Sequence, residues 1–157
     1  MENIELPMLE VRNLTKKFQH VTANADVSFE VAHGEIHCLL GENGAGKSTL
    51  AECIYGYYQA DAGAIYIEGK LVELTSPAAA IRHGIGMVHQ HFVMVPSMTT
   101  VENIAIGKAD REFGLGLEQV HEAVSQLCER YDVDLDLHAK VWQLPVGKQQ
   151  WGEIFKA

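Results

Sequence analysis

The sequence lacks any run of about 18 apolar residues, the length that would suggest a membrane-spanning helix. It also has little cysteine. Cys38, Cys53 and Cys128 are far apart and show no C-x-x-C spacing, so neither a disulfide framework nor a zinc site is expected. The first five residues lack the basic and apolar regions of a secretory signal. These absences favour a protein of the reducing cytosol with no direct membrane span.

Positive charge is also scarce. The chain has 12 Lys and Arg residues against 21 Asp and Glu residues, a net charge of -9. This excess of acid argues against binding to nucleic acid or to anionic lipid. The 157 residues are 47% hydrophobic, which is enough to build a globular core.

The most specific pattern present is a phosphate-binding loop. Residues 41–49 read Gly-Glu-Asn-Gly-Ala-Gly-Lys-Ser-Thr, with glycines where backbone N–H groups must wrap phosphates without side-chain interference. Lys47 can reach the outer phosphates, the Ser48 hydroxyl can bind Mg²⁺, and the helix that follows points its positive dipole end at the anion. The predicted nucleotide-binding residues of this loop are Gly41, Asn43, Gly44, Ala45, Gly46, Lys47, Ser48 and Thr49.

The segments on either side of the loop have the required character. Ile36–Leu40 is largely apolar and predicts a buried strand, whereas Leu50, Ala51 and Ile54 form a helical stripe that stops at Gly56. Strand, loop and helix therefore follow one another in the order that a phosphate loop needs.

The remaining strand signals predict a small sheet. Short strands are expected at 8–11 and 27–31, separated by the polar stretch Asn13–Lys17. Residues 64–74 predict a hairpin that turns at Glu68–Lys70, and Ile85–Val88 is a candidate core strand.

The helix signals lie mostly in the second half. Ser76 and Pro77 can start a helix that ends by Gly84. Thr99 and Glu102 have capping-box spacing, which predicts a helix from Thr100 to about Ile106. A third helix is expected where apolar residues recur at helical period from Leu117 to Tyr131.

Three motifs in this order resemble the ATP-binding subunit of an ABC transporter: the phosphate loop, Gln90 after a strand, and Leu144–Gln150 before a helix. The string Met87–Phe92 looks most like subunits of nucleoside and simple-sugar importers. The resemblance implies an α/β P-loop NTPase of the ABC type, with an antiparallel β subdomain and a helical subdomain. It places the nucleotide-binding core at 1–92 and the helical subdomain at 93–157.

The resemblance also implies roles for residues beyond the loop. Phe18 would stack on adenine, and Gln90 would touch Mg²⁺ and the attacking water. Gln90 and Lys47 would be the catalytic residues. The family's signature loop corresponds to Leu144, Pro145, Val146, Gly147, Lys148 and Gln149, and would contact ATP held by a second subunit.

The cofactors and partners implied by the family follow from these roles. ATP and Mg²⁺ would bind the chain, and its partners would be transmembrane permease subunits, a second ATP-binding subunit or domain and, indirectly, a solute-binding protein. The chain would then work at the cytoplasmic face of the cell membrane.

The sequence departs from the family pattern near its end. Pro145 replaces a serine and lacks a backbone donor, and Gly152 is expected to weaken the last helix. Only residues 148–157 follow Gly147, and Glu153 is their sole acid, so the acidic strand and switch histidine of the family are missing. We therefore expect a domain that is truncated after the signature loop and is marginally stable or prone to aggregate. It is expected to bind ATP but to hydrolyse it poorly or not at all.

Other functions fit the residues less well. The alternative is a non-catalytic nucleotide-binding or interaction fragment, or a decayed gene product, and a P-loop kinase is disfavoured by the signature-like loop. Asp132, Asp134 and Asp136 open a calcium-loop pattern that Leu137 breaks at its sixth position. His89 and His91 lack an evident third metal ligand.

Overall fold

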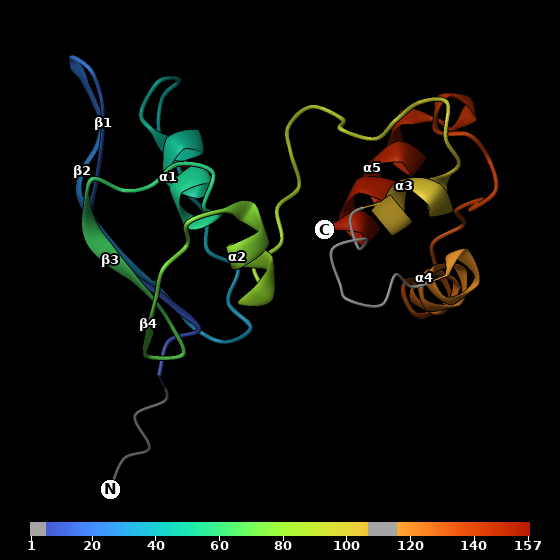
Figure 1. Ribbon diagram of the computed structural model, residues 1–157, viewed down its shortest axis with the longest axis horizontal. Coiled ribbons are helices and arrows are strands. Elements are labelled where there is room, and N and C mark those ends of the chain that lie inside the picture. Colours follow the sequence, from blue (N-terminus) through green and yellow to red (C-terminus); the bar gives the residue numbers. More distant parts are fainter. Residues whose placement is uncertain (1–5, 107–115) are drawn as a thin grey trace, which may run out of the picture. The chain divides into compact units, whose positions relative to one another are not determined.

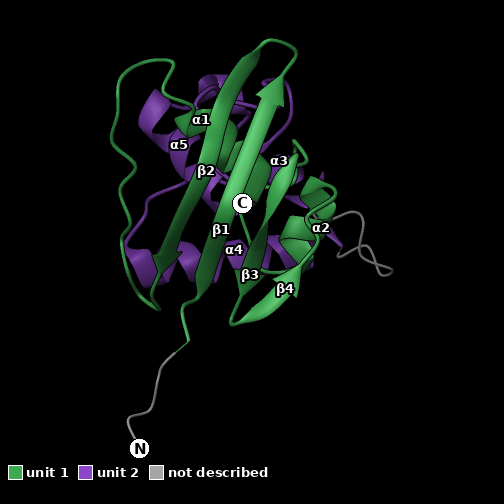
Figure 2. Cartoon of the chain, turned by 90° about the vertical axis from the view of Figure 1, so that its left-hand side faces the viewer, with its two compact units in different colours: residues 1–86 green, residues 87–157 purple. Residues whose placement is uncertain are grey.

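The computed structural model describes residues 6–106 and 116–157 (Figure 1). The chain divides into two compact units, Met1–Gly86 and Met87–Ala157, each with its own hydrophobic core (Figure 2). The boundary that the sequence suggests for the nucleotide-binding core, after residue 92, stays a prediction. Among the described residues no helix combines the length and the apolar character that crossing a bilayer requires.

The first unit is an antiparallel sheet with two helices. The sheet has the order β2-β1-β3-β4 (Figure 2). Its elements are β1 (Leu9–Phe18), β2 (Val21–Val31), α1 (Lys47–Ile54), β3 (Ala62–Ile67), β4 (Lys70–Val72) and α2 (Pro77–Arg82). The core joins side chains of the sheet to both helices and contains Val11, Leu14, Leu50, Cys53, Ile65, Leu74 and Ala80. The antiparallel β subdomain expected from the sequence is therefore present.

Strands β1 and β2 are longer than predicted. The polar stretch Asn13–Lys17, expected to separate two strands, lies inside β1, where the pairing with β2 shifts register. Asn13 has a φ of 52° and its N–H donates to Ser28 Oγ at 2.8 Å, while Asp26 N–H donates to Thr15 Oγ1 at 3.0 Å. Because side chains satisfy the backbone at these bulges, polar residues continue the strand rather than end it.

The β3–β4 hairpin forms as predicted. Ile65 pairs with Val72 and Ile67 with Lys70 across the turn. Glu68 and Gly69 have φ values of 49° and 73°, the positive values that a two-residue turn between antiparallel strands requires.

Two strands predicted from apolar runs do not form. Residues 36–40 and 85–88 have no regular secondary structure, and the Ile36 and Leu40 side chains are 91% and 92% exposed. A buried parallel strand needs a hydrogen-bonded neighbour on its edge, and none of the described strands pairs with either segment. These segments are apolar, but the predicted strand conformation is wrong.

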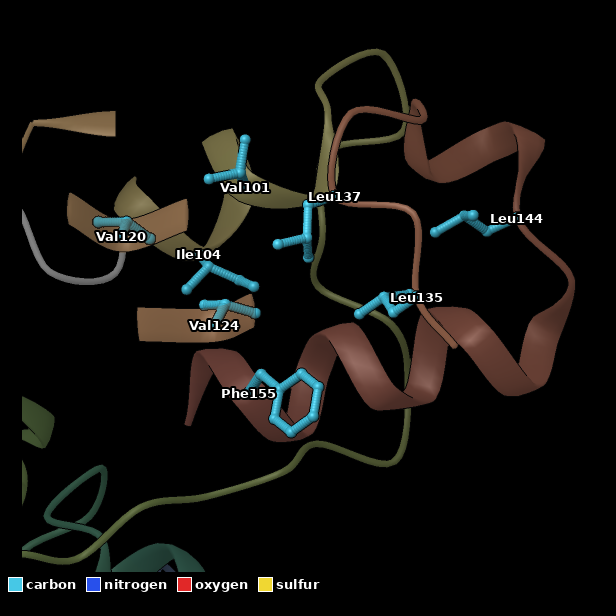
Figure 3. Packing of buried hydrophobic residues seen from close by; sticks show 8 residues of the cluster. All are labelled: Val101, Ile104, Val120, Val124, Leu135, Leu137, Leu144 and Phe155. Carbon is cyan, nitrogen blue, oxygen red and sulfur yellow. The ribbon is translucent and has the colours of Figure 1, made fainter. Parts of the chain in front are cut away.

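The second unit is helical. It contains α3 (Thr100–Ile106), α4 (Leu117–Tyr131), the short 3₁₀ helix η1 (Val141–Gln143) and α5 (Val146–Lys156). Figure 3 shows its core, in which α3, α4 and α5 and the segment 135–144 meet. The buried residues there are Val101, Ile104, Val120, Val124, Leu135, Leu137, Leu144 and Phe155.

The predicted helix starts are confirmed by their caps. Ser76 Oγ accepts the Ala79 N–H at 3.2 Å at the start of α2. At α3, Thr99 N–H donates to Glu102 Oε2 at 2.7 Å and Glu102 N–H donates to Thr99 Oγ1 at 3.3 Å. These reciprocal bonds form the capping box, and they hold the pKa of Glu102 below its ordinary value.

Candidate nucleotide-binding site

The phosphate loop is a sequence of tight turns that ends where α1 begins. Gly44 and Gly46 have φ values of 84° and 87°, and Gly46 is the N-cap of α1. Both are in the left-handed region, which glycine adopts without steric cost. The N–H groups of the first turn of α1 have no partner within the helix, so they are available to an anion lying against the loop.

Strand β2 supports this loop from behind. A Cβ on Gly46 would lie 2.2 Å from the Ala23 carbonyl oxygen and 2.9 Å from Asn24 Nδ2. Asn24 is buried, and its Nδ2 donates to the Gly46 carbonyl oxygen at 3.2 Å, while its Oδ1 has no partner. Asn24 is not predictable from the sequence, because nothing in a strand pattern marks a residue that contacts a loop 22 positions away.

Lys47 bridges the loop that it follows. Its Nζ donates to the carbonyl oxygens of Gly41 and Glu42, both at 2.8 Å. The ammonium group is thus held across the turn 41–46, where it can exchange these carbonyls for phosphate oxygens. Lys47 therefore places a positive charge across this loop.

The other predicted loop residues lie in the same turn or at the start of α1. The Ala45 N–H closes a turn on the Glu42 carbonyl at 3.2 Å, and Asn43 is exposed at the same turn. Ser48 is exposed in the first turn of α1 and Thr49 beside it is half-buried. The Ser48 hydroxyl is the kind of hard oxygen donor that Mg²⁺ prefers, so this position suits a metal bound together with phosphates.

Phe18 ends β1 in the same unit, and its ring is 37% exposed. Tyr58 packs edge-on against it with ring centroids 5.0 Å apart, and Lys16 Nζ lies 5.2 Å from the Phe18 centroid. A half-exposed ring held in this way offers a stacking surface. Tyr58 is a supporting residue that the sequence analysis did not single out.

Gln90 lies in the second unit, exposed at a bend in an irregular segment. The predicted site residues therefore fall into two sets. Phe18 and the loop 41–49 belong to the first unit, and Gln90 and the signature-like loop 144–149 belong to the second.

The signature-like loop leads directly into α5. Leu144 is buried, Pro145 is the N-cap, and Val146 and Gly147 are exposed at the first turn. Gln149 Nε2 donates to the Leu144 carbonyl oxygen at 2.8 Å, which fixes the loop to its helix. The start of α5 therefore presents backbone N–H groups without a large side chain at Gly147.

Lys148 does not point freely into solvent. Its Nζ donates to Asp134 Oδ2 at 2.7 Å, and this bond with its charge lowers the pKa of Asp134. Asp136 Oδ1 accepts the N–H groups of His138 and Ala139, and Asp132 caps α4 in the left-handed region. The three aspartates thus have separate structural roles, and the described ranges contain no cluster of three or more His, Cys, Asp or Glu residues able to hold a metal ion.

A glycine-rich turn that hands over to a helix, with a lysine across it, is the geometry of a P-loop nucleotide-binding fold. The chain belongs to the ABC transporter family, whose sequence profile matches residues 24–157. Solved structures agree with this fold. An ATP-binding cassette of an ABC transporter, solved in its ADP conformation, is 28% identical with a TM-score of 0.83, over 96% of this chain and 64% of that one. A nucleotide-free cassette is 27% identical with a TM-score of 0.82. The predicted fold class is confirmed.

Curated relatives point to import proteins. The chain is 41% identical to the glucose import ATP-binding protein TsgD13 of Haloferax volcanii and 42% identical to the guanosine import ATP-binding protein NupO of Bacillus subtilis. It is 44% identical to the ribose import ATP-binding protein RbsA 1 of Rubrobacter xylanophilus. These matches cover 95 to 96% of this chain, which spans 29 to 33% of the length of the relatives.

Proposed function

We propose that this chain supplies the ATP-binding, energy-coupling part of an ABC importer for nucleosides or simple sugars. The observation that carries the proposal is the loop 41–46, with its two left-handed glycines and Lys47 held across it. The names of the relatives, which include guanosine, glucose and ribose import, support the transported class.

ATP is the proposed ligand of the first unit. Its phosphates would lie against the N–H groups at the start of α1, with Lys47 moving from the Gly41 and Glu42 carbonyls to the phosphate oxygens. Adenine would stack on Phe18, a contact expected to contribute about 1 to 3 kcal/mol by analogy with base stacking on aromatic side chains. Ser48 would hold Mg²⁺, which neutralises phosphate charge when bound.

Poor hydrolysis by these 157 residues is the second part of the proposal. Attack by water on the γ-phosphate requires groups that orient and polarise it beside the phosphates. Glu153, the acid present among residues 150–157, accepts the N–H groups of Val93 and Met94 instead. Gln90 can orient a water but cannot accept its proton. Binding without efficient turnover is therefore the expected behaviour.

The proposed partners follow from the two sets of site residues. The exposed turn at Val146 and Gly147 would approach ATP held by a second ATP-binding subunit, and permease subunits would receive the coupled motion. A solute-binding protein would act indirectly through the permease. This assigns the chain to the cytoplasmic face of the cell membrane, as a peripheral subunit.

Calorimetry with ATP and Mg²⁺ tests the proposal. Lys47→Ala is expected to weaken ATP binding about 10- to 100-fold, because a charged hydrogen-bonding group contributes about 1.5 to 3 kcal/mol. The matched control is Lys70→Ala, which removes an exposed lysine from β4 and leaves the loop intact. Equal ATP affinity in the wild type and Lys47→Ala would refute the assignment of the loop. Turnover that Lys47→Ala abolishes would show an active ATPase and would refute poor hydrolysis.

A further inference from the structure

A buried carboxylate joins α5 to the segment that follows Gln90. Glu153 is only 5% exposed, and its Oε1 accepts the N–H groups of Val93 at 2.6 Å and Met94 at 2.9 Å. These amides lie three and four residues beyond Gln90, and Glu153 lies on the helix that begins at the signature-like loop. One side chain therefore connects two motifs that are about 60 residues apart in the sequence.

The surroundings of Glu153 indicate that this connection is specific. The described ion pairs do not include it, so its charge is balanced by main-chain dipoles and not by a cation. A buried carboxylate is costly unless hydrogen bonds compensate the lost hydration, and bonds from N–H groups to an ionised acceptor are among the stronger ones. A neutral residue would fill the space at lower cost. The carboxylate is thus suited to holding the backbone at this point.

Gly152 provides the room for the same contact. A Cβ at this position would lie 2.9 Å from Met94 Sδ and 3.0 Å from Met94 Cε. Glycine lowers helix propensity at this position, but the close packing of Met94 requires a small residue there. Met94 therefore contacts α5 in two ways: its side chain packs against Gly152, and its backbone N–H donates to Glu153.

A second helix holds the next residue of the segment. Asn103, buried in α3, accepts the Val95 N–H through Oδ1 at 2.6 Å and donates to the Val95 carbonyl through Nδ2 at 3.0 Å. Three successive residues, 93–95, are therefore fixed through their main chain. Gln90 itself is exposed, three residues before this fixed segment.

We propose that Glu153 is a positioning residue that fixes the segment after Gln90 to the helix of the signature-like loop. A displacement of the start of α5 would then be transmitted to the backbone beside Gln90 without any direct contact between the two motifs. The role given to Gln90 rests on the proposed function, whereas the tie itself is a property of the second unit alone.

Amide hydrogen exchange measured by NMR on the full 157-residue chain, without nucleotide, tests the tie. Glu153→Ala should raise the exchange rates of the Val93 and Met94 amides about 10-fold or more, since one charged acceptor serves both. Glu153→Gln keeps an acceptor oxygen of similar shape, so it should restore most of the protection. Glu129→Ala, which removes an exposed carboxylate of α4, is the matched control and should change neither rate.

Two results would overturn the proposal. The first is unchanged exchange of both amides in Glu153→Ala. The second is an equal rise throughout α3 and α4 that Glu153→Gln does not rescue, which would mean a general packing role. Should Glu153→Ala fail to fold, Glu153→Gln decides alone: we expect a rise of about threefold confined to the two amides, and no local rise would refute the tie.

ATP calorimetry on the same variants separates this inference from the proposed function. The phosphate loop lies in the first unit, so the ATP affinity of Glu153→Ala and Glu153→Gln should stay within about twofold of the wild type. A wild-type chain that takes up no ATP would remove the proposed function and leave the exchange result intact. A loss of ATP uptake in Glu153→Ala with Val93 and Met94 unaffected would contradict the role given to Glu153.

Discussion

Alanine substitutions at the two left-handed glycines of the phosphate loop should lower stability for different reasons. One variant has only the cost of a left-handed backbone, and the other has a steric overlap as well. Gly44 and Gly46 have nearly equal φ values, 84° and 87°. A Cβ on Gly44 would meet no atom within 4 Å, whereas a Cβ on Gly46 would lie 2.2 Å from the Ala23 carbonyl oxygen. The two alanine variants therefore differ in the contact with β2.

The expected magnitudes follow from these two terms. Left-handed backbone costs an alanine about 1 to 2 kcal/mol, so Gly44→Ala should lower the free energy of unfolding of the first unit by about that amount. Gly46→Ala adds an overlap with a backbone oxygen that cannot rotate away, and overpacking of this kind costs a further 1 to 3 kcal/mol, roughly. Gly46→Ala should therefore be the less stable variant by about 1 to 3 kcal/mol.

Urea unfolding followed by circular dichroism measures both variants, with amide exchange of Val11 as a probe inside the core of the first unit. Both tryptophans lie in the second unit, at Trp142 and Trp151, so tryptophan fluorescence reports on the part of the chain that carries neither change. Equal losses of stability in Gly44→Ala and Gly46→Ala would refute close packing of β2 against the loop at Gly46.

Three further predictions concern pH, self-association and the second unit. Asp61 accepts the Lys17 N–H, and this bond lowers the pKa of Asp61 below the ordinary 3.8, so the stability that it gives is complete above pH 3.8 and is lost as the pH falls through the lowered pKa. Asp61→Asn should therefore reduce the loss of unfolding free energy at acid pH, measured from about pH 2 to 6, and an unchanged loss would contradict the assignment. Ile36→Glu should reduce concentration-dependent association in sedimentation velocity, because Ile36 and Leu40 are 91% and 92% exposed in the apolar run 36–40. Val21→Glu, at an exposed position of β2 outside that run, should not reduce it, and equal effects would refute a role for the run. Asn103→Ala should destabilise the second unit by about 1 to 3 kcal/mol, because the part-buried N–H and carbonyl of Val95 lose their side-chain partners. An unchanged free energy of unfolding, followed by tryptophan fluorescence, would disprove this.

What the sequence predicted well was governed by neighbours along the chain. The capping box of Thr99 and Glu102, the Ser76 cap and the turn at Glu68 and Gly69 each depend on residues within four positions, and all form as expected. The turns of the loop and the helix that follows it belong to the same group, because the glycines, Lys47 and α1 are contiguous, whereas nucleotide binding by the loop stays a prediction.

What the sequence did not predict depended on partners far along the chain. Apolar residues 36–40 have the composition of a buried strand, but strand conformation requires a paired neighbour that composition cannot specify. The roles of Asn24 behind Gly46 and of Glu153 beneath Met94 involve side chains 22 and 59 positions from their partners. The packing of Met94 against Gly152 is unpredictable for the same reason, since helix propensity does not describe the side chain that packs against a residue.

Backbone amide chemical shifts on addition of ATP and Mg²⁺ test the central claim most directly, because they locate the phosphates on the chain. We expect the largest changes at the amides from Gly44 to Ser48, with a smaller ring-current change at Phe18. In Lys47→Ala the same changes should require about 10- to 100-fold more ATP. Saturating ATP that leaves the amides of the loop unmoved, or that shifts only residues outside it, would contradict the account.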